Sequence, residues 1–415
     1  MVRSAEIAHL GRRFPEFGLA AVPVIPDFKA VFERKDRIVE SLSGEEQSLA
    51  EQGVDFLHTR AWFTSPHRVT TDNGEIEASK FIIATGSVPS VPSIPGLAQT
   101  GFWTSDEALF PDRHPRQMIV IGGSAVGCEL AQIYARLGTG VTIIEMLPQL
   151  LGSEDPEIAA ILREAFIDED IECITGATVT QVSGLPGGEK TVRYEVDGRS
   201  AVLSADEILV ATGRRPQLEG LNLPAAGIEA NDGVLAVDNR LRTSQPHIWA
   251  CGDVTGEPML AHMASYEGEV AGHNSTTEEP HWQRADSRVV PRAVFTDPPV
   301  ASAGVSEAAA RARGHDVVVG HYPYSDLGRA VAMGETRGTV KLVADRLTRK
   351  LMGASIIGAG ADMVIHEAVI AIGSDLKVDA LARPQAVHIH PTISEAAGWA
   401  AEEIKEMMLA LRKAG

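Results

Sequence analysis

Residues 388–395, HIHPTISE, place an imidazole and a carboxylate, those of His390 and Glu395, close together along the chain. Because proline favours the first turn of a helix, we expect His390 at a helix start and Glu395 about one turn further on. A carboxylate near an imidazole orients the ring, fixes its tautomer and raises its basicity, which makes a general base. The same residues contain Thr392-x-x-Glu395, a helix-capping box that needs no catalytic role, and the sequence alone favours that plainer interpretation.

A glycine-rich turn lies between a predicted strand and a predicted helix in residues 118–145, MIVIGGSAVGCELAQIYARLGTGVTIIE. Gly122 permits the tight turn, Gly127 permits close packing of helix on strand, and Ser124 stands where the dinucleotide fingerprint usually has its middle glycine. A pyrophosphate would lie on the helix N-terminus, where unpaired N–H groups and the helix dipole favour an anion. The candidate binding residues of the turn are Gly122, Gly123, Ser124, Ala125, Val126 and Gly127.

Glu145 ends the strand that follows this predicted helix. Its carboxylate could accept hydrogen bonds from the adenosine ribose hydroxyls and would repel a 2′-phosphate, so we expect NAD rather than NADP. The alternative is a glycine turn in an ordinary α/β domain beside an incidental acid. Strand, helix and acid all stand in the register of the fingerprint, which favours the nucleotide site.

Residues 243–253, TSQPHIWACGD, predict a buried strand that ends in Gly252-Asp253. Open α/β sheets bind ligands at this edge of their strands. Asp253 could accept a hydrogen bond from a sugar or ribitol hydroxyl, and Gly252 would let a ligand approach the backbone. A strand end that caps a turn explains the same residues equally well.

The chain also contains a short internal echo. IIATGSVP at residues 82–89 and LVATGRRP at residues 209–216 both continue a strand into Ala-Thr-Gly and then a proline. Two such copies on either side of a nucleotide-binding unit suggest two dinucleotide domains of related design, although so short an echo also arises by chance.

The elements that must position these residues follow from the apolar pattern. The first fifty residues predict two helices, the second from Asp27 to about Ala50, before short strands near residues 54–57 and 81–84. The βαβ unit from Gln117 opens a Rossmann-like domain. Further predicted elements are a helix at 156–168, β-rich segments at 179–203, strands at 207–211 and 247–251, a polar linker at 275–288, and an α+β domain with helices at 361–372 and 394–411.

Composition excludes several classes of protein. The net charge is −19, from 37 basic and 56 acidic residues, which argues against a nucleic-acid partner. Cys128, Cys173 and Cys251 are the only cysteines and form no CxxC or CxxxxC spacing, so we expect no disulfide framework, no metal site and a reducing cytoplasm. The apolar runs are too short for a membrane span, and we find no signal peptide.

Taken together, the motifs resemble the pyridine nucleotide-disulfide oxidoreductases, and the dihydrolipoamide dehydrogenase branch in particular, over essentially the whole chain. The resemblance implies that Thr85, Gly86 and Ser87 contact FAD, that Asp253 binds the ribitol, and that Met259, Leu260, Ala261 and His262 lie along the flavin ring. On the nicotinamide side it implies Gly122 to Gly127, Glu129, Glu145 and Gly213, with Val179 as a weaker match. His390 would exchange a proton with the substrate thiol while Glu395 orients it.

The resemblance implies an α/β fold with two Rossmann-like dinucleotide-binding domains, the FAD domain incomplete at its N-terminus, and a C-terminal α+β dimerisation domain. The expected limits are residues 1–116 and 242–288 for the flavin domain, 117–241 for the NAD domain and 289–415 for the dimerisation domain. FAD and NAD are the implied cofactors. A homodimer is implied, with His390 reaching across the subunit interface, and the substrate would be a small dithiol or disulfide or the lipoyl domain of a dehydrogenase complex.

The sequence departs from the family pattern at its start. Members of the family begin with a flavin-binding GxGxxG and a helix that carries CxxxxC, and neither motif occurs in these 415 residues. We therefore expect either a fragment or misplaced start of an enzyme, or a natural truncation that binds NAD without redox chemistry. Mercuric reductases share the serine-containing loop but have a C-terminal cysteine pair where this chain ends MMLALRKAG, and glutathione reductases prefer NADPH through arginines near the position of Glu145.

Overall fold

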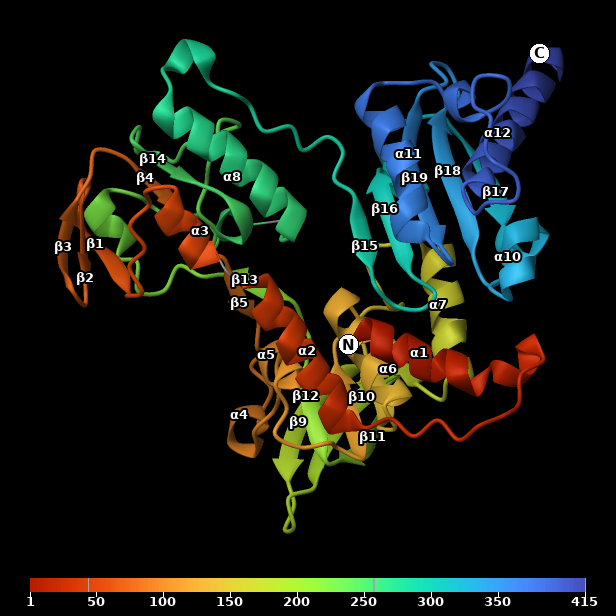
Figure 1. Ribbon diagram of the computed structural model, residues 1–415, viewed down its shortest axis with the longest axis horizontal. Coiled ribbons are helices and arrows are strands. Elements are labelled where there is room, and N and C mark those ends of the chain that lie inside the picture. Colours follow the sequence, from red (N-terminus) through yellow and green to blue (C-terminus); the bar gives the residue numbers. More distant parts are fainter. Residues whose placement is uncertain (44, 257, 415) are drawn as a thin grey trace. The chain divides into compact units, whose positions relative to one another are not determined.

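The computed structural model describes residues 1–43, 45–256 and 258–414. The chain divides into two compact units, each described by itself below (Figure 1). Unit 1 comprises Met1–Arg34, Val91–Thr212 and Arg288–Gly415, and unit 2 comprises Lys35–Ser90 and Gly213–Ser287. The fold is mixed α/β, as the sequence predicts.

Unit 1 contains a four-stranded parallel sheet in the order β12-β6-β7-β8. The predicted βαβ unit is present as β6 (Gln117–Ile121), α6 (Ala125–Arg136) and β7 (Gly140–Ile144), followed by α7 (Pro156–Asp168), β8 (Glu172–Ile174) and β12 (Glu207–Val210). Alternate β6 residues face opposite layers: Met118 and Val120 pack with α6, whereas Ile119 and Ile121 pack with the antiparallel sheet. That second sheet consists of β9 (Thr178–Gly184), β10 (Lys190–Val196) and β11 (Arg199–Ala205).

The C-terminal part of unit 1 is a five-stranded antiparallel sheet in the order β15-β16-β19-β18-β17. Two long helices, α11 (Ala361–Gly373) and α12 (Glu395–Ala414), pack on it, and Figure 1 shows α11 in front of β16 and β19. This matches the predicted α+β domain. Its remaining elements are β15 (Arg292–Val294), β16 (Val300–Gly304), α9 (Glu307–Ala312), β17 (Val317–Pro323), α10 (Gly328–Met333), β18 (Thr339–Asp345) and β19 (Leu351–Ile357).

Unit 2 contains the first copy of the internal echo and the end of the second copy, from Gly213. The first copy supplies β4 (Phe81–Ile83) and β5 (Ser87–Pro89), and the second ends in β13 (Arg214–Pro216). β5 and β13 pair antiparallel with each other, so the echo reflects two segments that meet in space. β4 pairs parallel with β14 (Ile248–Ala250), which leads into a 3-10 turn at Gly252–Thr255 and then α8 (Ala261–Thr276). A three-stranded antiparallel sheet of β1 (Ala61–Ser65), β2 (Arg68–Thr71) and β3 (Gly74–Glu77) completes the strands described in this unit.

The N-terminal region differs from its prediction in two respects. The helix expected from Asp27 to about Ala50 is two helices, α2 (Phe28–Leu42) and α3 (Glu45–Glu51). Ser41 and Ser43 donate hydroxyl hydrogen bonds to carbonyls three residues earlier, a local alternative to the helical ladder that favours a helix end. The strand expected near residues 54–57 is also wrong, because that segment has no regular structure. Shorter helices elsewhere are α4 (Leu97–Thr100) and α5 (Ser105–Leu109).

The unit limits differ from the expected domain limits in three places. Residues 1–34 belong to unit 1, because α1 (Val2–Arg12) packs on α6 and Arg12 Nη2 donates to the carbonyl of Arg136 at 2.8 Å. Residues 91–116 also belong to unit 1, where Trp103 forms a bridge with Leu209 of β12. Residues 213–241 belong to unit 2, because β13 pairs with β5.

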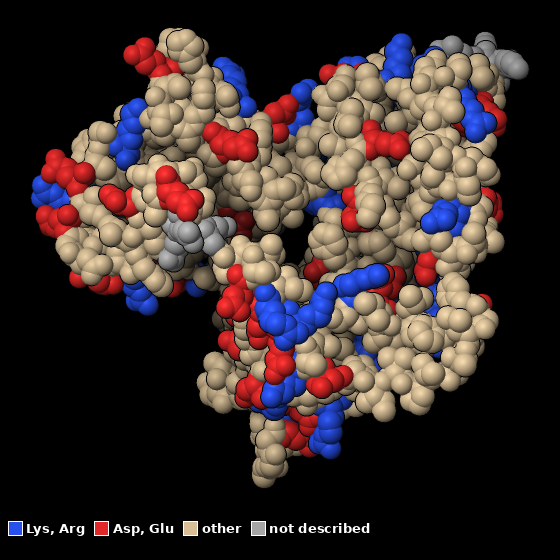
Figure 2. Space-filling model, viewed as in Figure 1, with Lys and Arg blue, Asp and Glu red and all other residues tan. Residues whose placement is uncertain are grey.

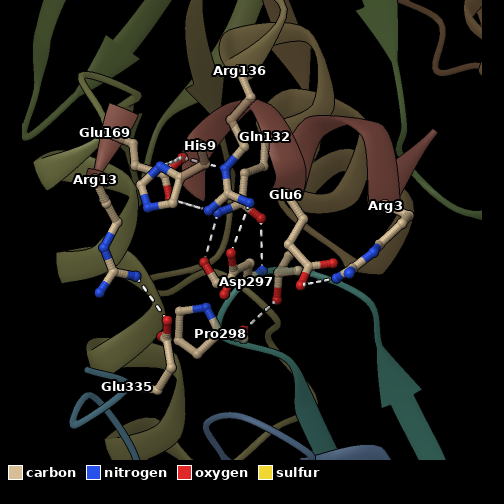
Figure 3. A network of polar contacts seen from close by, with 11 residues as sticks. Arg3, Glu6, His9, Arg13, Gln132, Arg136, Glu169, Asp297, Pro298 and Glu335 are labelled. Atoms are coloured by element: carbon tan, nitrogen blue, oxygen red, sulfur yellow. Dashed lines mark hydrogen bonds and ion pairs between the residues drawn. The ribbon is translucent and has the colours of Figure 1, made fainter. Parts of the chain in front are cut away.

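A buried polar network joins α1, α6, the end of α7 and the chain after β15 (Figure 3). Arg136 is 3% exposed; its Nε and Nη2 donate to the Glu169 carboxylate at 2.7 Å each, and its Nη1 lies 2.8 Å from Asp297 Oδ2. Gln132 donates to the carbonyl of Asp297 at 2.7 Å and accepts from its N–H at 2.7 Å. The network therefore ties the parallel sheet's helix layer to the C-terminal sheet within unit 1.

Acidic and basic side chains lie intermixed on the face shown in Figure 2. Among residues 1–43, 45–256 and 258–414, no helix is both long and apolar enough to cross a membrane.

Candidate functional site

The glycine turn of unit 1 has the geometry that its sequence predicts. Gly122 follows β6 with φ +108°, in the left-handed region, and a Cβ there would overlap the carbonyl oxygen of Ala211. A Cβ at Gly127 would overlap the carbonyl oxygen of Gly122, so α6 can approach the turn only with glycine at this position. Both glycines are therefore required by close backbone packing.

Ser124 stands at the N-cap of α6 in an extended conformation and is exposed, with Ala125 and Val126 in the first turn. Its hydroxyl makes no capping bond and donates instead to the carbonyl of Ala211 at 3.3 Å. The serine is thus compatible with an open helix N-terminus, where unpaired N–H groups attract an anion.

Glu145 lies directly beside the turn. Its Oε2 accepts the Gly123 N–H at 2.5 Å, and its Oε1 accepts the Leu147 N–H at 2.7 Å. The Ala177 N–H donates to the carbonyl of Glu145 at 2.9 Å, which brings β9 and the half-buried Val179 to the same edge of the sheet. The fold therefore collects the nicotinamide-side residues of unit 1 that lie far apart in sequence.

Glu129 lies on α6, about one turn after Ala125, the first residue of the helix. Its Oε1 accepts the Phe295 N–H at 2.8 Å, so the side chain links α6 to the segment after β15. Burial raises the pKa of Glu129, and the Phe295 hydrogen bond offsets part of that rise.

The flavin-side residues named from sequence lie in unit 2, and several of them meet. The Ser87 hydroxyl donates to Asp253 Oδ2 at 2.5 Å. Thr85 Oγ1 donates to the carbonyl of Gln217 at 2.8 Å, and the carbonyl of Gly86, with φ +69°, accepts the Gln217 N–H at 2.9 Å. The carbonyl of Gly213 accepts the N–H of Ser90 at 2.9 Å, which also joins the two Ala-Thr-Gly segments.

The stretch after Asp253 leads into α8. Met259 and Leu260 are half-buried, Leu260 is the N-cap of α8, and Ala261 and His262 are exposed in its first turn. This stretch therefore presents a helix N-terminus close in sequence to the Gly-Asp turn.

Two residues near this turn, Arg214 and Glu267, were not predicted from the sequence. Arg214 donates from Nε to Ser87 Oγ at 2.7 Å and from Nη2 to the Ser87 carbonyl at 2.8 Å. Glu267 of α8 accepts the Gly252 N–H at 2.8 Å. Arg214 directly follows the second Ala-Thr-Gly, so the echo itself was the signal that could have identified it.

His390 and Glu395 form the pair that the sequence suggests. Nδ1 of His390 lies 3.0 Å from Glu395 Oε1 and 3.2 Å from Oε2. The Glu395 side chain is 6% exposed, whereas the imidazole is 77% exposed. The buried carboxylate thus holds an accessible ring, and its contact with Nδ1 leaves Nε2 as the base of the neutral imidazole.

The expected helix start at His390 is wrong. α12 begins only at Glu395, and Pro391 lies before it in non-helical chain. The capping box is half formed: Glu395 Oε2 accepts the Thr392 N–H at 3.0 Å, but the Thr392 hydroxyl donates to the Ile389 carbonyl at 2.7 Å instead of capping the helix. The capping and imidazole-holding interpretations are therefore both partly right, because one carboxylate makes both contacts.

The environment of Glu395 favours its charged form. Burial alone would raise the pKa of this carboxyl group, but the Thr392 N–H and the His390 ring outweigh burial and hold the pKa below its usual value. An ionised, buried carboxylate next to an accessible imidazole is suited to orienting a proton-transfer group.

Replacement of Gly127 by alanine is expected to destabilise unit 1 by about 1–3 kcal/mol, because the added methyl group overpacks the turn against Gly122. Thermal unfolding and an NADH titration of the same variant would both show the loss. Gly272→Ala is the matched control, since a Cβ there faces open space on α8. Equal melting temperatures for Gly127→Ala and the wild type would contradict the packing argument.

Comparison with known proteins identifies the family of the chain. Residues 3–268 match the family "Pyridine nucleotide-disulphide oxidoreductase", and residues 290–401 match its dimerisation domain. The mercuric reductase of Bacillus cereus is 33% identical over 392 residues, which are 94% of this chain and 62% of that protein. The dihydrolipoyl dehydrogenase of Thermus scotoductus is 36% identical over 419 residues, covering 99% of this chain and 88% of that protein.

A solved structure gives the same result. The HOCl-induced flavoprotein disulfide reductase RclA from Escherichia coli superimposes with a TM-score of 0.83 at 27% identity, covering 98% of this chain and 89% of that chain. This chain spans less than two thirds of the length of the Bacillus cereus mercuric reductase. The family matches, the relatives and the shared fold together show that the chain belongs to the pyridine nucleotide-disulphide oxidoreductase family, whose members depend on FAD and NAD(P).

Proposed function

We propose that this protein is a flavoprotein of the dihydrolipoamide dehydrogenase type, which moves electrons between a dithiol or disulfide and NAD. The observation that carries the proposal is the His390–Glu395 pair, with Nδ1 3.0 Å from Oε1. Oxidation of a dithiol requires a base that takes a thiol proton, and an accessible imidazole held by a buried carboxylate can do so. His390 is the proposed proton-transfer residue, and Glu395 the residue that orients it.

FAD and NAD, when bound, would carry the electron pair between the substrate and the final acceptor. The residues proposed to hold NAD are the turn from Gly122 to Gly127 and Glu145, because an open helix N-terminus and a ribose-binding carboxylate stand side by side. For FAD, the fit rests on Ser87 and Asp253, whose contact holds a carboxylate at the end of β14 beside a glycine backbone. Among the described residues, β4 and β14 form the parallel sheet of unit 2 that carries this carboxylate.

The chain should prefer NADH to NADPH, because the Glu145 carboxylate offers acceptors to a free 2′-hydroxyl and repels a phosphate. Fluorescence titration of both nucleotides is expected to show that Glu145→Ala lowers the preference about tenfold, or ~1.4 kcal/mol. Because Glu145 also holds Gly123, Glu145→Gln separates loss of charge from loss of the loop contact, and Glu164→Gln, an exposed acid on α7, is the control. Tighter NADPH binding by the wild type, unchanged in the Glu145 variants, would refute the assignment.

The proposed substrate is a small dithiol or disulfide, or the lipoyl domain of a dehydrogenase complex, in the cytoplasm. The dimerisation-domain match supports a homodimer. Mercuric reductase-like and glutathione reductase-like activities are the alternatives. The HPTxxE segment favours the dihydrolipoamide type over the first, and Glu145 favours it over the second.

A second candidate function is an NAD-binding dimer without disulfide chemistry. Its support is the state of Cys128, Cys173 and Cys251, which are 0%, 7% and 6% exposed. Burial raises the pKa of each thiol, that of Cys173 to about 12, so none is a ready thiolate. Purification separates the two functions: a yellow protein that reduces NAD with dihydrolipoamide supports the first, and a colourless NADH-binding dimer supports the second.

A further inference from the structure

A second imidazole–carboxylate pair lies beside the first. Nε2 of His388 donates to Glu367 Oε2 at 3.0 Å, and Glu367 belongs to α11. The His388 ring is 13% exposed, in contrast to the 77% exposed ring of His390 two residues later. The His388 ring is therefore largely buried, whereas the His390 ring is accessible.

The His388 ring also fits against α12. A Cβ at Gly398 would lie 2.9 Å from both Cε1 and Nδ1 of His388, so the ring rests directly on the backbone of that glycine. Gly398 stands three residues after Glu395 on the same helix, which places the ring about one helical turn from the carboxylate that holds His390. His388 thus contacts both α11 and α12.

The segment between the helices alternates in exposure. Val387 and Ile389 are 81% and 79% exposed, and His388 between them points inward. Residues 384–394 have no helix or strand of their own, so the position of His390 depends on side-chain anchors. The described anchors next to it are the Glu367 contact of His388 on one side and the Glu395 contacts on the other.

We propose that His388 and Glu367 are positioning residues that hold the loop so that the ring of His390 meets Glu395 through Nδ1. The significance for catalysis rests on the proposed function, but the positioning itself can be measured without turnover. Without the upstream anchor, the loop samples conformations in which Nδ1 leaves the carboxylate. A hydrogen bond contributes a factor of about two- to tenfold in such an equilibrium.

The test is the tautomer of His390 in the purified chain labelled with ¹⁵N-histidine. Long-range ¹H–¹⁵N spectra distinguish a ring protonated on Nδ1 from one protonated on Nε2, and His390→Gln assigns the signal. The wild type should show a single neutral tautomer with the proton on Nδ1, because Glu395 accepts from that atom. His388→Ala and Glu367→Ala should each give mixed tautomers and lower the population of the Glu395-bound ring about two- to tenfold.

Rescue by glutamine separates positioning from simple packing. The amide nitrogen of His388→Gln can still donate to Glu367, so this variant should retain most of the single-tautomer signal, although it loses the ring that packs on Gly398. His366→Ala, which removes an exposed imidazole on α11 next to Glu367, is the matched control and should leave the signal unchanged. If His388→Ala does not fold, Glu367→Ala still tests the contact, since the His388 ring remains.

The outcomes are distinct. A single wild-type tautomer in both alanine variants, lost only in Glu395→Gln, would show that His388 and Glu367 do not position His390. Mixed tautomers in the wild type would show that the His390–Glu395 pair does not persist in solution, which would count against the proposed function as well. Loss in the alanine variants with rescue by glutamine supports the positioning role even in a chain that proves inactive.

Discussion

Replacement of His390 by alanine is expected to lower the rate of dihydrolipoamide oxidation about 10²- to 10⁴-fold, the usual contribution of general acid–base catalysis. The rate is measured in a fusion in which the chain follows the flavin glycine loop and cysteine pair of a dihydrolipoyl dehydrogenase relative. The reason for the size of the effect is that the imidazole is accessible and held through Nδ1, so its removal leaves the thiol proton without a positioned base. NADH formation at saturating NAD gives the rate.

The controls for this prediction lie on the same domain. His366→Ala removes an exposed imidazole of α11 and should leave the rate unchanged. Glu395→Gln should lower the rate less than His390→Ala, because the base remains but loses its orienting charge. A near-normal rate for His390→Ala would leave His390 as a loop residue without a chemical role.

Local chemistry in this protein was predictable from sequence. The turn at residues 122–127 needs glycine at 127 because α6 meets the carbonyl of Gly122 within the same βαβ unit, whereas the close contact of Gly122 is with Ala211, far along the chain. The His390–Glu395 contact is similarly local, although the helix start was misplaced. Pro391 favours a helix start at His390, but α12 begins only at Glu395, whose carboxylate accepts the Thr392 N–H from the segment before the helix.

Contacts between distant segments were not predictable. Glu129 was expected from the family to serve the nicotinamide site, but its hydrogen bond to the N–H of Phe295 joins residues 166 positions apart. The hydrogen bond between Ser87 and Asp253 also joins residues 166 positions apart. The internal echo indicated the pairing of the Ser87 strand with β13, but nothing in the sequence indicated its contact with Asp253. The periodicity of apolar residues in a sequence does not indicate which polar side chains contact each other across such distances.

The packing of α1 illustrates the same limit. Its apolar pattern predicts a helix but does not indicate which layer the helix covers. The family resemblance assigns this helix to the flavin domain. In the structure α1 lies against α6, and His9 Nδ1 lies 3.9 Å from Glu169 Oε2 within the polar network of Figure 3. Burial lowers the pKa of His9, and the nearby Arg136 charge adds to that effect, so the neutral ring is favoured beside this cation.

Replacement of Arg136 by methionine is expected to destabilise unit 1 by about 3 kcal/mol, the lower end of the range for removing one partner of a buried ion pair. The guanidinium is 3% exposed and bonds Glu169, 12% exposed, through two nitrogens, so the variant leaves a buried carboxylate without its cation. Asp297 is 30% exposed and can regain water, which is why the lower end applies. Hydrogen exchange of peptides from α1 and α6, with calorimetry of the whole chain, measures the loss.

Two further variants decide whether the charge itself is responsible. Arg116→Met removes a guanidinium that is 89% exposed and paired with Asp206, and it should change stability by less than about 0.5 kcal/mol. Adding Glu169→Gln to Arg136→Met removes the stranded carboxylate, so the double variant should be more stable than the sum of the two single losses predicts. Additive losses would mean that Arg136 stabilises α1 and α6 through its apolar stem, and a loss below about 1 kcal/mol would mean that water replaces the guanidinium without a stranded buried charge.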